Sequence, residues 1–248
     1  MASNEGRVAV ITGGGTGIGR ASALALAKDG VNVVVNYSRS AQDAEQTAED
    51  VRKLGRRSLA VKANVQSRED CERLIKTAHD ELGRIDVLVN SAGMTKFIPY
   101  PDLEALDDEV WQQIMQTNLM GAFYTSRAAA RHMLAQGSGA IVNIASIAGY
   151  GTNASSIPYA VSKGAMITLT KCLARALAPK VRVNAVAPGV VETRWVGDNE
   201  DFKAQGRAAT PLGRNATADD VAAAVRYLAL DATFVTGQIH NVDGGRVI

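Results

Sequence analysis

Short apolar runs alternate along the chain with longer segments whose apolar residues recur at helical spacing. Apolar, β-branched runs of about four to eight residues between turn residues are typical of buried strands. We expect strands at residues 7–11, 31–35, 58–62, 85–89, 139–144, 181–186 and 238–242. Apolar residues three and four apart predict helices between them. We expect these helices at residues 20–28, 41–54, 67–82, 107–136, 159–178 and 217–230.

Strands that alternate with long helices predict a parallel sheet that helices cover on both faces. Nothing in the chain resembles a linker, so we expect one α/β domain over residues 1–248, a Rossmann-type doubly wound sheet of about seven strands. Such sheets bind ligands at the carboxyl ends of their strands. The chemically suggestive residues all follow strand ends, namely Gly13 to Gly19, Asn90 to Gly93, Ser146 and Pro188-Gly189.

A glycine-rich turn joins the first predicted strand to the first helix, with glycines at positions 13, 17 and 19. A turn in this place presents backbone N–H groups and a helix N-terminus to a pyrophosphate. A plain tight turn could use the same residues. The strand, turn, helix and strand in sequence nevertheless favour a dinucleotide site.

The end of the second strand bears on the choice of cofactor, because an acidic residue there grips the ribose 2′-hydroxyl of NAD. The chain instead has Asn36, followed by Arg39 and Ser40. No carboxylate is present to repel a 2′-phosphate, and Arg39 and Ser40 could bind one. We therefore expect NADP(H) to be preferred, with NAD(H) as the alternative. A solvated loop arginine is the other interpretation of Arg39.

Tyr159 and Lys163 are four residues apart and so lie one turn from each other on one helix face. A free phenol has a pKa of about 10, and a nearby ammonium stabilises the phenolate and lowers that pKa. The pair can therefore act as a proton donor and acceptor. Taken alone, the same spacing also fits an ordinary exposed helix pair.

Composition and charge exclude several other classes of protein. Hydrophobic residues make up 46% of the chain and the net charge is +2, which does not favour a nucleic-acid partner. No apolar run is long enough for a membrane span, and the first residues lack a signal-peptide core, so we expect a cytoplasmic protein. Two cysteines and three histidines show no metal-ligand spacing, so no metal site is expected.

Taken in order, these motifs resemble those of the short-chain dehydrogenase/reductase family over essentially the whole chain. The resemblance rests on Thr12-Gly13-x-x-x-Gly17-x-Gly19, Asn90-x-Ala92-Gly93, Asn118, Ser146, Tyr159-x-x-x-Lys163 and Pro188-Gly189. Two positions depart from the usual pattern: Ser91 replaces an asparagine, and Asn64 replaces an aspartate that often contacts adenine.

The resemblance implies a role for four side chains. Tyr159 would donate a proton to a carbonyl oxygen while hydride arrives from the nicotinamide. Lys163 would lower the pKa of Tyr159 and bind the nicotinamide ribose, and Ser146 would orient the substrate oxygen. Asn118 would hold a water that links Lys163 to solvent. A turn serine and a mid-helix amide are the structural alternatives for Ser146 and Asn118.

The resemblance also implies a set of cofactor contacts, with residues 188–193 around the carboxamide. The expected contacts are Gly13, Gly15, Thr16, Gly17, Ile18, Gly19, Asn36, Arg39, Ser40, Asn64, Val65, Asn90, Ala92, Gly93, Tyr159, Lys163, Pro188, Gly189, Val191 and Thr193. At one of them, Thr16, many NADP-dependent relatives carry a basic residue.

Among these relatives, the chain is most like the 3-oxoacyl-[acyl-carrier-protein] reductases. Carrier proteins are acidic, and of the basic residues that would dock one only Arg175 matches, because residues 135–140 lack the usual cations. We expect Met94, Tyr150 and Trp195 to line an apolar pocket for a ketone or secondary alcohol. The substrate would be a small thioester such as an acyl-CoA, or an acyl carrier protein. A sugar or polyol dehydrogenase and a non-catalytic dinucleotide sensor are the alternatives.

Two further expectations concern the lid and the assembly. Residues 190–213 contain Gly197 and Gly206 and are expected to form a lid over the substrate, with an ordinary surface helix and loop as the alternative. Relatives pack two long helices against their copies in a tetramer. Small residues expected on the outside of these helices suggest the same homotetramer here, namely Ala128, Ala129, Ala165, Ala174 and Ala178.

Overall fold

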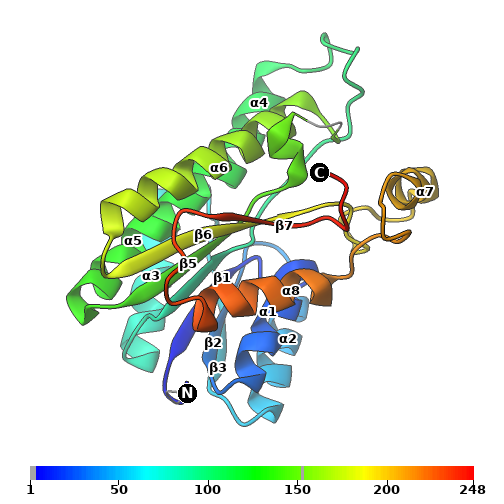
Figure 1. The fold of residues 1–248 in the computed structure, drawn as a ribbon. Helices are drawn as coiled ribbons and strands as arrows, with labels where there is room; N and C mark the ends of the chain where they lie inside the picture. The colour runs from blue at the N-terminus through cyan, green and yellow to red at the C-terminus, as the bar shows by residue number, and fades with distance from the viewer. Residues whose placement is uncertain (1–3, 152–153) are drawn as a thin grey trace.

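The strands form one parallel sheet of seven members in the order β3-β2-β1-β4-β5-β6-β7 (Figure 1). The structure is a computed structural model and describes residues 4–151 and 154–248. The strands are β1 (Val8–Thr12), β2 (Asn32–Tyr37), β3 (Ser58–Lys62), β4 (Val87–Asn90), β5 (Gly139–Ile144), β6 (Val181–Pro188) and β7 (Ile239–Val242). The predicted doubly wound sheet is thereby confirmed.

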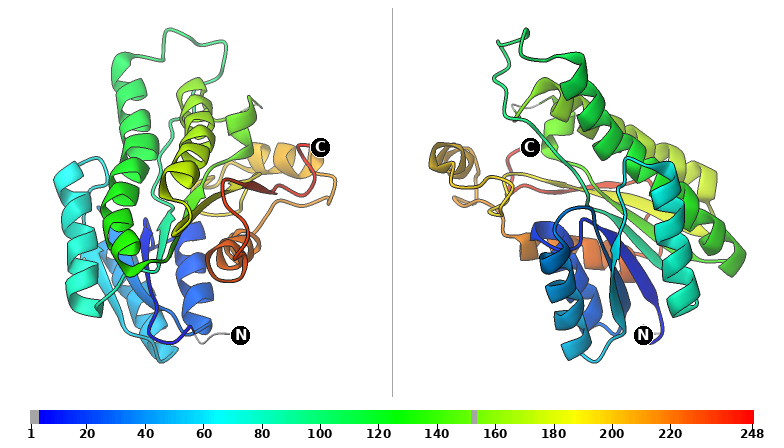
Figure 2. Two further views of the ribbon diagram at one scale, coloured as in Figure 1. Left: turned by 60° about the vertical axis from the view of Figure 1, so that its left-hand side comes forward. Right: turned by 180° about the vertical axis from the view of Figure 1, so that it is seen from behind.

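Helices cover both faces of the sheet, as the two views of Figure 2 show. One apolar core packs helices α1, α2 and α8 against the sheet, and the other packs α3, α5 and α6. Successive strand residues point to opposite faces, so Ala9 and Ile11 enter the first core and Val8 and Val10 the second. The helices are α1 (Gly17–Lys28), α2 (Ala41–Lys53), α3 (Arg68–Leu82), α4 (Asp108–Met115), α5 (Gly121–Gln136), α6 (Ile157–Leu177), α7 (Glu200–Ala208) and α8 (Ala218–Arg226).

The long helix expected over residues 107–136 is interrupted. A π-helical turn, η1 (Gln116–Met120), separates α4 from α5. Apolar periodicity continues through this turn, so the sequence pattern did not indicate it. Such turns occur frequently at functional sites, and this one carries Asn118. Two other short turns are η2 (Ile147–Tyr150) after β5 and η3 (Tyr227–Asp231) after α8.

The proposed small outer residues need correction, because three of the five are part of the monomer's own core. Ala128, Ala129 and Ala174 are at most 4% exposed and pack in the second apolar core. Ala165 is partly buried and Ala178 is exposed. The helical spacing was right, but the face assigned to the outside was largely the face that covers the sheet.

A buried polar network ties the centre of the sheet to two helices. Asn90 on β4 donates to Ser126 Oγ at 2.9 Å and to Asn143 Oδ1 on β5 at 2.8 Å. Thr125 on α5 donates to Asn90 Oδ1 at 2.6 Å, and Asn143 donates to Thr170 on α6 at 3.0 Å. Buried polar groups are costly unless all are paired, so this network fixes α5 and α6 against the carboxyl half of the sheet.

The network predicts a specific stability loss. Asn143→Ala removes the acceptor of one Asn90 amide hydrogen and the donor that meets the Thr170 hydroxyl in the core, so we expect a loss of about 1–3 kcal/mol in the free energy of unfolding. Urea denaturation followed by circular dichroism measures it. The matched control is Asn241→Ala on the exposed part of β7, which should stay within about 0.5 kcal/mol of the parent. Equal stabilities for the two variants would contradict this account.

Candidate active site

The glycine-rich turn after β1 is shaped by what its glycines lack. Gly13 and Gly17 have φ of +62° and +52°, a region that side chains rarely adopt. A Cβ on Gly19 would stand 2.3 Å from the carbonyl oxygen of Gly13. Helix α1 begins at Gly17, and its N-cap residue Thr16 makes no side-chain capping bond. The first N–H groups of α1 are therefore available to an anionic ligand.

The carboxyl ends of the strands border a cleft of about 730 Å³ that runs from this turn to α7. Most of the predicted site residues line it. These are Gly13, Thr16, Gly17, Ile18, Asn36, Arg39, Asn64, Val65, Ala92, Gly93, Met94, Ser146, Tyr159, Lys163, Pro188, Gly189, Val191, Thr193 and Trp195.

The other predicted residues lie outside the cleft lining, namely Gly15, Gly19, Ser40, Asn90, Asn118 and Tyr150. Gly15 lets the backbone of α2 approach, since a Cβ there would meet the Ala44 nitrogen at 3.0 Å. Ser40 is exposed at the start of α2. Asn90 lies behind the cleft in the core network.

Tyr150 is the predicted substrate contact that the structure moves elsewhere. Its side chain is 42% exposed, and its hydroxyl donates to Asn241 on β7 at 2.8 Å. It lines a second cavity, between the C-terminal part of α6 and the residues before β7. The turn η2 directs the ring toward β7, and the residue's position after Ser146 in the sequence could not show this.

Tyr159 and Lys163 lie on the first turns of α6, where Pro158 near the N-terminus favours helix initiation. Lys163 is 5% exposed, and its ammonium donates to the Ile144 carbonyl at the end of β5 at 2.7 Å. The ammonium stands 5.6 Å from the centroid of the Tyr159 ring. The exposed helix pair considered for this spacing is therefore wrong for Lys163.

Burial sets the protonation of this pair. It raises the pKa of Tyr159 to about 12, against a hydrogen bond with Ser146 that lowers it. Burial lowers the pKa of Lys163 to about 8. Desolvation is the largest effect on the phenol here, and the Lys163 ammonium is turned to Ile144, so a lowering of the Tyr159 pKa by Lys163 stays a prediction.

Asn118 is fully buried in η1 and holds three elements together. Its Oδ1 accepts from the Met94 N–H at 2.8 Å, and its Nδ2 donates to the Met94 carbonyl at 3.0 Å and to Ser162 Oγ at 2.9 Å. Ser162 in turn donates to the Tyr159 carbonyl at 2.7 Å. Both amide hydrogens of Asn118 are thus used in fixing the loop after β4 and the first turn of α6.

At the other end of the cleft, Asn36 and Arg39 differ in their surroundings. The Asn36 side chain is 1% exposed and is used within the protein, since it accepts from the Gly13 N–H at 3.3 Å and donates to the Ala63 carbonyl at 3.0 Å. Arg39 is exposed, and its guanidinium has no hydrogen-bond or carboxylate partner in the described part of the chain. Nearby Asp43 is engaged by Arg194, whose guanidinium holds the pKa of that carboxyl below its usual value.

Aromatic side chains form the end of the cleft beside Tyr159. Trp195 lies with its ring centroid 5.9 Å from that of Tyr159. Phe97, from the loop after β4, meets Phe202 of α7 edge to face at 5.6 Å. Phe97, Phe202 and Ser162 escaped the sequence analysis. Only Ser162 carried a signal, its place directly before Lys163, since the two phenylalanines meet through tertiary contact alone.

Across residues 4–151 and 154–248, His, Cys, Asp and Glu nowhere gather in threes as metal ligands would. Over the same residues, every helix is too short or too polar to cross a bilayer.

Comparison with known proteins agrees with this geometry. The model of a family described as "Enoyl-(Acyl carrier protein) reductase" matches residues 13–246. The chain belongs to the short-chain dehydrogenase/reductase family. It is 46% identical to ketoacyl reductase 2 of the granaticin polyketide synthase of Streptomyces violaceoruber, over 97% of this chain and 96% of that one. It is 40% identical to a 3-oxoacyl-[acyl-carrier-protein] reductase of Synechocystis, over all of both chains.

The solved structures include the NADPH-dependent 3-quinuclidinone reductase of Rhodotorula rubra. It is 30% identical to this chain, with a TM-score of 0.92 over 99% of this chain and 92% of that one. The sheet and its helical layers are therefore those of this family of oxidoreductases.

Adding a single methyl group to the glycine-rich turn should weaken binding of the cofactor. Gly19→Ala must push the Gly13 carbonyl away, so we expect the Kd for a nicotinamide dinucleotide to rise at least about tenfold. Fluorescence titration measures it. The control is Gly83→Ala, which is strained by its φ of +86° but meets no atom within 4 Å and does not line the cleft. If both variants bind the dinucleotide like the parent, the turn is not its site.

Proposed function

We propose that the protein is an NADP(H)-dependent reductase of 3-oxoacyl thioesters, which converts the ketone to a secondary alcohol. The observation that carries the proposal is the set of buried Lys163 and half-buried Tyr159 and Ser146 beside a glycine turn that leaves the start of α1 open. Proton donor, substrate-orienting hydroxyl and cation thus border the same cleft as the expected cofactor contacts.

The residues of the cleft fit a nicotinamide dinucleotide. The pyrophosphate would lie at the N-terminus of α1, beside Gly13 and Gly17, and Asn64 and Val65 would border the adenine. The bound dinucleotide supplies the hydride. Unpaired Arg39 favours the 2′-phosphate of NADP(H), because no carboxylate at position 36 opposes it.

The side chains supply the proton and hold the charge. A carbonyl oxygen between the Ser146 and Tyr159 hydroxyls would receive two hydrogen bonds. Tyr159 keeps its proton at neutral pH because its pKa is about 12, and it is thus ready as the donor to an oxygen that gains charge. Lys163, with a pKa of about 8, remains mostly an ammonium at pH 7 and would stabilise the phenolate that results. Asn118 positions α6 through Ser162, and its relay water remains a prediction.

The substrate end favours an apolar ketone over a polyol. Met94, Trp195, Phe97 and Phe202 line it, and two of the relatives above are named as ketoacyl or 3-oxoacyl reductases. Docking of an acidic carrier gains little from Arg175, which lies on the last turn of α6, about 24 Å along the helix from Tyr159. The reductase would therefore accept small thioesters without strong recognition of a carrier.

Three accompanying proposals follow the family. The chain would act in the cytoplasm as a homotetramer, in which helices α5 and α6 pack against their copies. The segment 190–213 would act as a lid, since α7 within it reaches Phe97 across the cleft.

Removal of the Tyr159 hydroxyl tests whether this residue is the proton donor. Tyr159→Phe should lower kcat for acetoacetyl thioesters by at least about 10²–10⁴-fold, while the Kd for NADPH stays within about twofold, because only the proton donor is lost. Stopped-flow NADPH oxidation and fluorescence titration give the two values. A panel of polyols with NADP+ is run beside them. Near-normal kcat in the variant would refute the role of Tyr159, and turnover of polyols alone would replace the acyl assignment.

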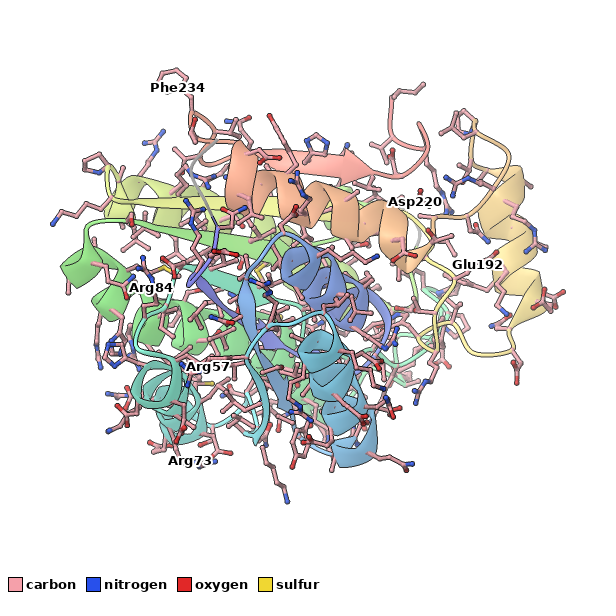
Figure 3. All side chains as sticks on the ribbon, turned by 90° about the horizontal axis from the view of Figure 1, so that it is seen from below. Arg57, Arg73, Arg84, Glu192, Asp220 and Phe234 are labelled. Atoms are coloured by element: carbon pink, nitrogen blue, oxygen red, sulfur yellow. The ribbon has the colours of Figure 1, made fainter. Side chains whose placement is uncertain are left out.

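The cofactor preference rests on one guanidinium. Arg39→Ala should raise KM for NADPH about ten- to a hundredfold and leave KM for NADH nearly unchanged, since only NADPH carries the 2′-phosphate. Arg73→Ala, a surface arginine on α3 labelled in Figure 3, is the matched control and should change neither. Equal losses for both cofactors would remove Arg39 from the 2′-phosphate site.

A further inference from the structure

The C-terminal segment brings a second unpaired arginine into the cleft. Arg246 lines the same cavity as Tyr159 and Trp195, although it lies beyond the last strand. Figure 1 shows the C-terminus beside α7 at the carboxyl edge of the sheet. Neither the glycine motif nor the catalytic motif accounts for a cation at this position.

A turn closed by hydrogen bonds to the Asp243 carboxylate holds Arg246 in place. Asp243 accepts from the Gly245 N–H at 3.0 Å and from the Val247 N–H at 2.9 Å, one bond on each carboxylate oxygen. On one side, a Cβ on Gly189 at the end of β6 would stand 3.2 Å from the Asp243 backbone. On the other, a Cβ on Gly245 would stand 3.3 Å from Pro211, just beyond α7. The turn is therefore packed between the last residues of β6 and the chain that follows α7.

The guanidinium of Arg246 has no anionic partner among the described residues. Within residues 4–151 and 154–248, no carboxylate or carbonyl oxygen pairs with its guanidinium, and both oxygens of the adjacent Asp243 are used by backbone N–H groups. Other cations of the cleft are engaged, Lys163 by the Ile144 carbonyl and Arg194 by Asp43. The exception is Arg39, which follows β2 at the opposite end, where the adenosine ribose is expected.

We propose that Arg246 binds an anionic group of the substrate, distant from the carbonyl that is reduced. A guanidinium pairs with phosphate or carboxylate through parallel N–H···O bonds. Arg246 lies at the end of the cleft that is next to α7. The apolar side chains at this end, such as Trp195 and Phe202, would cover the acyl part of the substrate. The proposal rests on the proposed 3-oxoacyl function and adds a specificity-determining residue to it.

The test compares substrates that differ by the anion alone. Acetoacetyl-4′-phosphopantetheine and acetoacetyl-pantetheine share the reacting thioester, and acetoacetate and its methyl ester provide the same contrast for a carboxylate. Arg246→Gln should lower kcat/KM for one anionic substrate about ten- to a hundredfold, through KM, and change its neutral counterpart less than about twofold. The pair that responds shows whether phosphate or carboxylate is bound.

The control is Arg175→Gln, an exposed arginine that lines the second cavity, and it should leave kcat/KM for all four substrates unchanged. Equal losses for charged and neutral partners in the Arg246 variant, or no loss in either pair, would overturn the anion site. Failure of the proposed function is distinct, because the parent protein would then turn over neither thioester.

Discussion

The burial of a lysine ammonium beside a tyrosine is the constraint on which the rest of the site depends. Removing the charge of Lys163 from water is costly, and one carbonyl, that of Ile144 at the end of β5, meets it directly. Helix α6 must therefore lie close enough to β5 for the Lys163 ammonium to donate to the Ile144 carbonyl. Asn118 and Ser162 hold the first turn of α6, and the Asn143–Thr170 bond holds its middle. The buried polar network and the π-helical turn thus serve the catalytic pair.

Much of the fold could be predicted because parallel strands buried on both faces carry nearly continuous β-branched runs, which Val33 to Val35 illustrate. The interruption at η1 could not be predicted, because a π-helical turn adds one residue without breaking the apolar pattern around Ile114 and Ala122. The error for Ala128 and Ala174 has a related cause, since alanine is compatible with either face of a helix and only the packing decides. Helix α7 is short and mostly polar, so it offers few apolar residues from which a helix could be predicted.

The candidate site divides in the same way. Residues whose role lies in backbone geometry or in a fixed helical spacing, such as Gly13 and Gly19 or Tyr159 and Lys163, could be predicted because the chemistry fixes their positions along the chain. Phe97 and Phe202 could not, since 105 residues separate two rings that touch. The pKa of Tyr159 was also beyond the sequence, because the cation partner was evident there and the extent of desolvation was not.

The central claim is that the phenol of Tyr159 keeps its proton while the neighbouring lysine titrates near neutrality. Carbon-13 NMR of protein labelled at tyrosine Cζ, with the Tyr159 signal assigned by its loss in Tyr159→Phe, measures this directly. The account predicts that Tyr159 shows no phenolate shift up to about pH 10, because desolvation raises its pKa well above the reference value of about 10. A phenolate signal at pH 8 would contradict it, since the Lys163 ammonium would then outweigh desolvation and lower the pKa of Tyr159 below its reference value.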